Sequence, residues 1–323
     1  MPRAICFLVL CSTMWGQSAV LLVLQRGSRA LGIYDLAGNQ VAAIPIGGYP
    51  HEMDLSPDGR FAYSTDSGTM PDEGPGSGGH AVAIIDLITR KKAGEIGLEK
   101  FRRPHGVDVD IITGRVYVST EWPDQLLALD PKTRKIVRTY DTKGKIAHMV
   151  TLGPGGKFAY VSNSGSNNVA AIDLASGGVT LIATGKRPEG SVLSKDGTRL
   201  YVACRDEDAI SILDTVKNAP AGEIRTGRGP ARIALTPMTG QLVYALGAAS
   251  RVEIVDPASR KVVGQIALER KPVSLSLSRD GRLAFAAAKG TVYVISVAER
   301  RVVREIRLPA DSEPDAVVET ALP

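Results

Sequence analysis

The 323 residues are 44% hydrophobic and 23% charged, which is typical of a globular chain and excludes a disordered or fibrous one. The formal net charge of +5 permits an anionic partner without requiring one, and three cysteines are too few for a disulfide-stapled scaffold or a cysteine-ligated zinc domain. The 34 glycines and 19 prolines, with only 5% aromatic residues, predict many tight turns around a core of small aliphatic side chains.

The chain begins with a segment typical of a secretory signal. A basic start, MPR, is followed by the short apolar run AICFLVL and by the small residues Gly16 and Ser18. The run is far shorter than the roughly 20 apolar residues of a membrane-spanning helix. We therefore expect a signal peptide over residues 1–18, a periplasmic or secreted protein, and a single domain over residues 19–323; the alternative is a buried first strand. In this mature chain Cys204 is expected to be a small core residue.

One pattern then recurs along the chain. Its anchor residues are separated by 54, 43, 41, 42, 42 and 42 positions, and they are Pro50, Pro104, Ala147, Pro188, Pro230, Pro272 and Pro314. Each of the first six anchors leads into an alternating strand, a turn such as SPDG, and three more strands, as in FAYSTD, AVAIIDL and KKAGEIGL. The aspartates that end the third strands are interpreted as turn-stabilising residues. Four strands in about 42 residues is the size of a β-propeller blade.

The two ends of the chain differ from the repeat in complementary ways. The segments VLLVLQR, ALGIYDL and NQVAAIPI match strands two, three and four, with no first strand before them. The C-terminal PDAVVET matches a first strand with nothing after it. The predicted fold is therefore an all-β, seven-bladed propeller, in which the C-terminal strand completes the N-terminal blade and leaves no exposed sheet edge.

The repeats resemble the YVTN-type bacterial β-propeller family. The resemblance rests on the SPDGR-like turns, on the strands FAYVSN, VYVST and LYVAC, and on third strands such as VAAIDL, and it covers residues 19 to about 320. It implies the propeller fold but no single function, because such families include binding modules, surface proteins and relatives of lactonase and lyase propellers.

Residues that break the repeat are candidates for function. At the first position of strand one, successive blades carry His51, His105, His148 and Glu189. Imidazole and carboxylate groups are common ligands of zinc and similar metals, so these four residues predict a site for one divalent metal. In the alternative interpretation the histidines line the channel wall or contact a ligand without a metal.

Other residues are expected around the same channel mouth. An insertion of 12 residues in GTMPDEGPGSGGH carries Asp72, Glu73 and His80, and it predicts either a flap or a tolerated surface loop. The opposite sector of the mouth is expected to carry small or apolar residues, apart from Arg228 and Arg232. The predicted ligand-contacting residues, among them a stacking platform of scarce aromatics with nearby arginines, are Tyr49, Glu52, Asp66, His80, Phe101, Arg102, Glu121, Trp122 and Asn163.

Two functions remain open from the sequence. The first is a binding module that recognises a small ligand or a protein partner at the channel mouth. The alternative is a metal-dependent lactonase, hydrolase or lyase, in which Glu189 is a ligand or base and Arg103 and Arg205 offset negative charge. No phosphate-binding loop, dinucleotide fingerprint or nucleophile elbow is present in the sequence, so no nucleotide or flavin cofactor is expected. The small net charge argues against nucleic acid.

Overall fold

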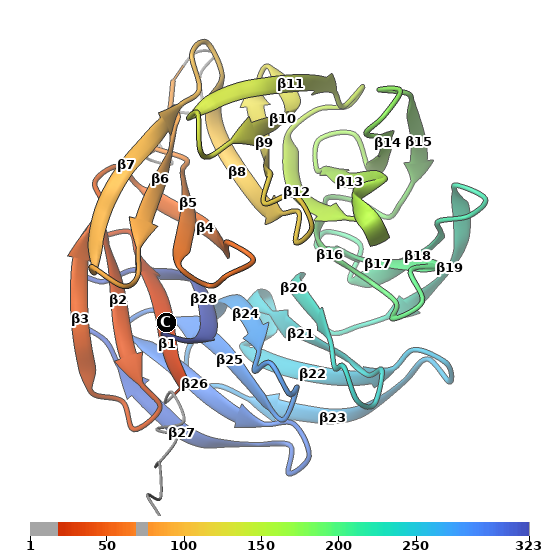
Figure 1. Ribbon diagram of the computed structural model, residues 1–323. Coiled ribbons are helices and arrows are strands. Elements are labelled where there is room, and N and C mark those ends of the chain that lie inside the picture. Colours follow the sequence, from red (N-terminus) through yellow and green to blue (C-terminus); the bar gives the residue numbers. More distant parts are fainter. Residues whose placement is uncertain (1–18, 69–76, 323) are drawn as a thin grey trace, which may run out of the picture.

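The computed structural model describes residues 19–68 and 77–322, which form seven four-stranded antiparallel sheets arranged in a ring (Figure 1). The innermost strands of neighbouring blades contact one another around the central channel. Two short 3₁₀ turns, Pro154–Gly156 and Gly247–Ala249, lie in connections between strands. The predicted number of blades and strands per blade is confirmed.

Within each blade the strands follow one another from the channel outwards. The composite blade contains β28 (Pro314–Ala321), β1 (Ala19–Gln25), β2 (Ala30–Asp35) and β3 (Gln40–Pro45). The next three blades are β4 (Pro50–Leu55), β5 (Phe61–Asp66), β6 (Ala81–Asp86) and β7 (Lys91–Gly97); β8 (Arg102–Val109), β9 (Val116–Trp122), β10 (Asp124–Asp130) and β11 (Lys135–Asp141); and β12 (Ala147–Leu152), β13 (Phe158–Asn163), β14 (Asn168–Asp173) and β15 (Val179–Ala183). The last three are β16 (Pro188–Leu193), β17 (Arg199–Cys204), β18 (Ala209–Asp214) and β19 (Ala219–Arg225); β20 (Pro230–Leu235), β21 (Leu242–Leu246), β22 (Arg251–Asp256) and β23 (Lys261–Ala267); and β24 (Pro272–Leu277), β25 (Leu283–Ala288), β26 (Thr291–Ser296) and β27 (Arg301–Arg307).

The ring is closed by pairing between the two ends of the described chain. Strand β28, blue in Figure 1, lies antiparallel beside the red β1, with Leu22 opposite Val318. Ala316 and Val317 of β28 are buried in the cores on either side of this blade. The inferred closure is thus confirmed, and β1 does not remain an unpaired edge.

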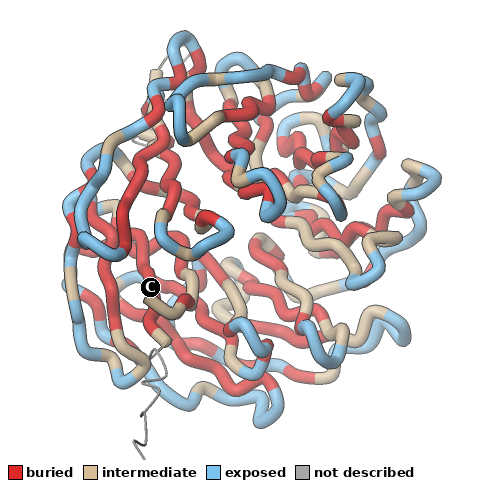
Figure 2. Tube along the Cα trace, viewed as in Figure 1, coloured by how far each residue is buried: buried red, intermediate tan, exposed pale blue. Residues whose placement is uncertain are grey.

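The cores lie between blades. One cluster joins Leu22 and Ile33 of the composite blade to Met53 and Ile85 of the next blade. Figure 2 shows the consequence: the inner and middle strands are mostly buried, and the outer strands and turns are exposed. Both faces of the middle strands are therefore covered, which explains continuous apolar runs such as VLLVL.

Side chains at the hairpins perform the predicted turn role. The Asp86 carboxylate accepts the backbone N–H groups of Ile88 and Thr89 at 2.9 and 3.1 Å. The equivalent side chains bind the following turn in the same way; they are Asp130, Asp173, Asp214 and Asp256. These aspartates therefore stabilise turns through local hydrogen bonds.

Cys204 is fully buried in a core cluster, and burial raises the pKa of its thiol, as expected for a core residue. The predicted signal segment, Asp72 and Glu73 lie outside the described residues. Within the part of the chain that is described, no helix has the length and apolar character to cross a membrane.

Candidate functional site

The three strand-one histidines lie in a row on adjacent inner strands. His51 of β4 and His105 of β8 have their Nε2 atoms 2.8 Å apart, and the two rings meet edge to face. The ring centroids of His105 and His148, of β12, are 3.7 Å apart. The repeat register therefore correctly brings these histidines together at the end of the channel where the inner strands begin, which we call the channel mouth.

A carboxylate lies at each end of the histidine row. Asp315 of β28 binds Nδ1 of His51, and Arg26 lies 3.4 Å from the same carboxylate. Glu189 of β16 lies 3.5 Å from Nε2 of His148. Asp315 stands at the same repeat position as His51, so the sequence held the signal for it although it was not among the predicted site residues.

Two arginines from its own blade also contact Glu189. Arg187 Nε is 3.2 Å from Oε1 of Glu189, and Arg205 Nη1 is 3.4 Å from the same oxygen. Burial opposes ionisation of Glu189, but the charges of the surrounding arginines outweigh this effect and lower its pKa. Arg205 therefore lies beside Glu189, and the carboxylate is ionised.

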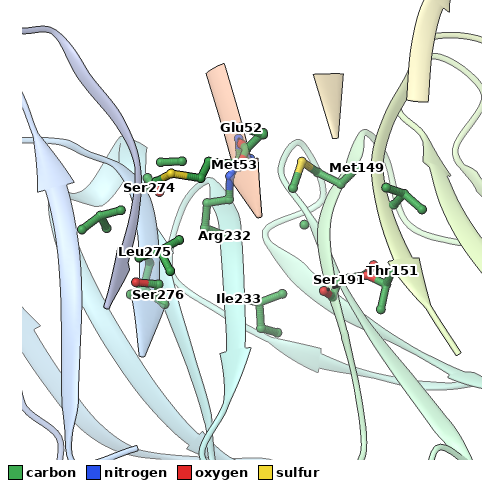
Figure 3. Close-up of a pocket in the computed structure, with 15 residues that line it drawn as sticks. Glu52, Met53, Met149, Thr151, Ser191, Arg232, Ile233, Ser274, Leu275 and Ser276 are labelled. Carbon is green, nitrogen blue, oxygen red and sulfur yellow. Dashed lines mark hydrogen bonds and ion pairs between the residues drawn. The ribbon is translucent and has the colours of Figure 1, made fainter. Parts of the chain in front are cut away.

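Arg232 connects the two sides of the channel. It projects from β20, and its Nη2 binds Oε1 of Glu52 on β4, while its Nη1 is 3.6 Å from Oε2 of Glu189 (Figure 3). The residue is 8% exposed. Arg232 was one of two exceptions named in an otherwise small or apolar sector, but its reach across the channel to Glu52 and Glu189 was not predicted. It stands two residues after its anchor, as Glu52 does, and this shared position was the available signal.

The three histidines differ in protonation. Burial opposes protonation of His51, but the adjacent Asp315 carboxylate outweighs burial and raises the pKa of His51. Burial, together with the neighbouring imidazoles, holds the pKa of His105 well below its usual value, and burial lowers the pKa of His148 to about 3 despite Glu189. The row therefore contains one ring that favours the cationic form and two neutral rings.

The contact between His51 and His105 uses one proton. One of the two Nε2 atoms donates it and the other accepts it. Nδ1 of His105 is buried and has no hydrogen-bond partner among the described residues. Arg103 Nη1 and Arg232 Nε are buried donors in the same condition within that part of the chain. Buried donors are seldom left without an acceptor, so the channel mouth has unused hydrogen-bonding capacity.

A cavity of about 180 Å³ lies in the channel next to this cluster (Figure 3). Glu52 and Arg232 line it together with Met53, Met149 and Ile233, and its other wall residues come from β12, β16, β24 and β28. The cavity therefore joins a charged end to a body lined by both apolar and hydroxyl-bearing side chains.

The structure does not bring the four predicted metal ligands together in one group. Among the described residues, one group offers three ligand atoms within 4.8 Å of one another, and it comprises His51, Glu52 and Asp315. His105, His148 and Glu189 are not members of that group. Both carboxylates of the group already contact arginines, Asp315 with Arg26 and Glu52 with Arg232.

Several predicted ligand contacts have structural partners. The Asp66 carboxylate accepts the backbone N–H of Tyr49 at 2.7 Å, and Asn163 is fully buried, where its amide donates to Asn168 at 2.8 Å. Glu121 pairs with Arg103 at 2.7 Å. These side chains therefore make hydrogen bonds and an ion pair that stabilise the rim of the mouth.

The aromatic platform is only partly formed. Phe101 is 4% exposed and packs between blades with Tyr63 and Val107, so it is a core residue; its expected place at the mouth is wrong because its apolar ring fills the space between two sheets. Trp122 is 38% exposed. Arg102 donates to the backbone carbonyl groups of Glu99 and Phe101, and His80 is exposed beside Glu95.

Comparisons with known proteins agree on the fold and leave the family open. No family model matches the sequence. Antigen Lp49 of Leptospira interrogans is 26% identical over 216 residues, which cover 59% of this chain and 44% of that protein, so the chain spans less than half of this curated relative.

Solved structures are similar over most of the chain. They include a functionally unknown protein from Desulfotomaculum acetoxidans (TM-score 0.77, 14% identity, 93% of this chain and 98% of that chain) and hydrazine synthase of Kuenenia stuttgartiensis (TM-score 0.68, 16% identity, 85% and 96%). A third is the dihydro-heme d1 dehydrogenase NirN in complex with DHE (TM-score 0.67, 16% identity, 89% of this chain and 63% of that chain). At these identities the likeness is one of fold, and the chain is a seven-bladed β-propeller.

Proposed function

We propose that the protein is an exported β-propeller that binds a small molecule at the channel mouth. The observation that carries this proposal is the buried cluster around Arg232 beside the cavity, in which Arg232 Nε and His105 Nδ1 have no hydrogen-bond partner among the described residues. A concave site with a few convergent polar groups beside an apolar cavity is the usual form of a small-molecule site. The small size of the cavity, about 180 Å³, favours a small ligand over a protein partner.

The propeller supplies rigidity to this site. His51, His105 and Glu189 come from different blades, and each is held at the start of an inner strand. Their relative positions therefore depend on packing of the whole ring and not on a loop. A preorganised site of this kind binds a ligand without a large ordering cost.

The proposal is tested with a matched pair of histidine variants. The full chain is screened against a panel of small polar metabolites by thermal shift, and any hit is measured by calorimetry with His105→Gln and with His80→Gln. We expect His105→Gln to weaken binding at least tenfold and His80→Gln to leave it unchanged, because His80 is exposed and lies beside Glu95. Ligands that respond equally to both variants would place binding elsewhere.

Export and family membership belong to the same proposal. We propose a YVTN-type propeller secreted to the periplasm or beyond, on the basis of the repeat motifs and the N-terminal segment. Amino-terminal sequencing of the protein recovered from the cell envelope is expected to begin at about Ala19. Recovery of the intact chain from the cytoplasm alone would contradict export.

A second candidate is a metal-dependent hydrolase or lyase, and the observation that favours it is the group of His51, Glu52 and Asp315. Two carboxylates and one imidazole suit a divalent metal. Arg26 and Arg232 oppose it, because each would lie close to the added cation. About one divalent ion per chain in elemental analysis, lost in Glu52→Gln, would establish this candidate; a metal-free protein that binds its ligand in the presence of chelator would refute it.

A further inference from the structure

The outer strands of the blades remain sheet edges. Ring closure pairs β1 with β28, but each blade still ends in an outer strand with no further strand beyond it in its sheet. Figure 1 shows these strands around the circumference of the ring, and all of them lie in the described part of the chain. An exposed edge offers unpaired N–H and C=O groups to another strand, and propellers usually keep such edges short and protected.

Six of the seven outer strands carry a β-bulge against their neighbour. In each of these pairs the outer strand has one extra residue, such as Ala93 of β7, at which the register shifts. A bulge twists an edge and interrupts its row of outward-facing groups. The pairing of β14 with β15 has no such shift and runs evenly from Asn168 opposite Ala183 to Ile172 opposite Val179.

Charged side chains protect most of the same strands, again with the exception of β15. At least one charged residue is present in each of β7, β11, β19, β23 and β27, whereas β15 has the sequence VTLIA within the uncharged stretch GGVTLIATG, residues 177–185. Strand β3, QVAAIP, is also uncharged, but it has a bulge and ends in a proline. Among the outer strands, β15 alone therefore has neither of these two protections.

The backbone of β15 presents a regular edge. Although the strand has only five residues, its ladder with β14 continues past its end, since the N–H of Thr184 donates to the carbonyl of Asn167 at 3.0 Å. In an antiparallel ladder alternate residues bond to the neighbouring strand. The N–H and C=O groups of Val179, Leu181 and Ala183 are therefore directed away from β14, where another strand could pair with them.

This edge is complementary to a second copy of itself. In two-fold antiparallel pairing about Leu181, that residue lies opposite its own copy and Val179 lies opposite Ala183 of the second copy, so all three outward-directed residues form hydrogen-bonded pairs. Like charges directly opposite each other destabilise a sheet, and the same pairing of β27 would bring Arg304 against its own copy. Across β15 uncharged side chains meet, and Leu181, which is 44% exposed, would lose apolar surface to the partner.

The charges beyond the uncharged stretch do not oppose this arrangement. Arg138 and Asp173 lie at the turn before β15. Lys186 follows the other end of the stretch, and Glu207 lies beside Gly185 there. Each end therefore carries both signs of charge, and two-fold pairing, which brings the two different ends together, does not collect charges of one sign.

We propose that the protein forms a two-fold dimer in which β15 of one copy pairs antiparallel with β15 of a second copy. The two blades then make one continuous sheet, to which each contributes its four strands. Pairing of so short an edge buries less than the roughly 1,200–2,000 Å² of a stable complex, so the dimer is expected to be weak and to form at micromolar to millimolar concentrations. This inference does not involve the channel mouth and goes beyond the proposed function.

The first test is a dilution series of the full chain followed by sedimentation velocity. We expect a monomer–dimer equilibrium, and we expect Leu181→Lys to weaken the dimer at least tenfold, because two cations would then face each other across the two-fold axis. Val41→Lys is the matched control, because Val41 is 41% exposed and is the extra residue in the bulge of β3, the other uncharged outer strand. This control should leave the equilibrium unchanged.

A pair of cysteine variants tests the register independently of an added charge. In the proposed pairing the two Cα atoms of Leu181 lie about 5.5 Å apart, within the range of a disulfide, so Leu181→Cys should give a covalent dimer with copper phenanthroline as the oxidant. Thr180 lies opposite Ile182 of the second copy, and Thr180→Cys should therefore cross-link at least tenfold more slowly. The other cysteines are the same in both variants, so the difference between the two rates reports on position.

Several results would overturn this inference. A chain that stays monomeric up to millimolar concentration would exclude the dimer and favour an extended segment of another protein as the occupant of the β15 edge. A dimer that is insensitive to Leu181→Lys, or that is weakened equally by Val41→Lys, would place the interface elsewhere, and equal cross-linking of the two cysteine variants would contradict the register. Ligand binding at the channel mouth and its dependence on His105 are measured separately, so the proposed function can stand or fail without the dimer.

Discussion

Replacing Arg232 with methionine removes the cation that reaches Glu52 and Glu189 across the channel while it retains much of the side chain's length. Glu52 and Arg232 are each 8% exposed, so the carboxylate of Glu52 would remain buried beside an apolar side chain. Glu189 would keep Arg187 and Arg205. The perturbation therefore acts mainly on Glu52.

The size of the effect follows from this burial. Removing one partner of a buried ion pair costs about 3–5 kcal/mol, because the other charge stays desolvated and unpaired. An exposed pair is worth only about 0–1 kcal/mol. Arg60 pairs with Asp86 at 2.9 Å, but 47% of its side chain is exposed, so Arg60→Met is the matched control. We expect Arg232→Met to lower the free energy of unfolding by about 3–5 kcal/mol, and we expect Arg60→Met to lower it by about 0–1 kcal/mol.

Urea unfolding followed by circular dichroism at pH 7 measures both changes as differences in the free energy of unfolding. Adding Glu52→Gln to Arg232→Met removes the unpaired charge, and it should recover more than about 1 kcal/mol of the loss. Equal costs for the Arg60 and Arg232 variants would refute the assignment of a buried, stabilising pair. Failure of the double variant to recover stability would show that lost packing, and not charge, dominates.

Three further predictions concern the fold. Burial and the neighbouring Asp54 raise the pKa of Asp108 to about 8, so the native state binds its proton more tightly than the unfolded state; the contribution of Asp108 to the free energy of unfolding should fall by on the order of 1 kcal/mol per pH unit as pH rises from about 4 towards 8, and Asp108→Asn should remove this contribution in a pH series of urea titrations. Ending the chain before Pro314 removes β28 and should cost on the order of 5 kcal/mol or abolish cooperative melting, whereas removing only residues 322–323 should leave the melting temperature unchanged. Cys204 should resist maleimide in the native protein and react rapidly in denaturant, with labelling located by peptide mass spectrometry; rapid native labelling would contradict its burial.

The fold could be predicted because its signal is repeated. A single run such as FAYSTD is ambiguous, but six repeats at a spacing near 42 residues define four strands per blade. The phase of the two ends then indicated closure, and β28 pairs with β1 as expected. The turn role of Asp86 could be predicted equally well, because it depends only on the N–H groups two and three residues later.

The site could be predicted only in part. His51, His105 and His148 were found because they share one repeat position, and repeat positions coincide around a ring. Phe101 was misplaced, because an aromatic ring before an anchor can face either the mouth or the space between blades, and only packing decides.

The pattern of the sequence thus established seven blades, the closing strand and the face on which the histidines gather, since all three depend on register alone. Tertiary structure decided which charges meet there. Arg232 spans the channel to Glu52, and Asp315 raises the pKa of His51 while His105 remains neutral, because these effects depend on side-chain reach and on burial across blades. Such contacts join residues that are up to 264 positions apart, and a repeat of about 42 residues carries no information on them.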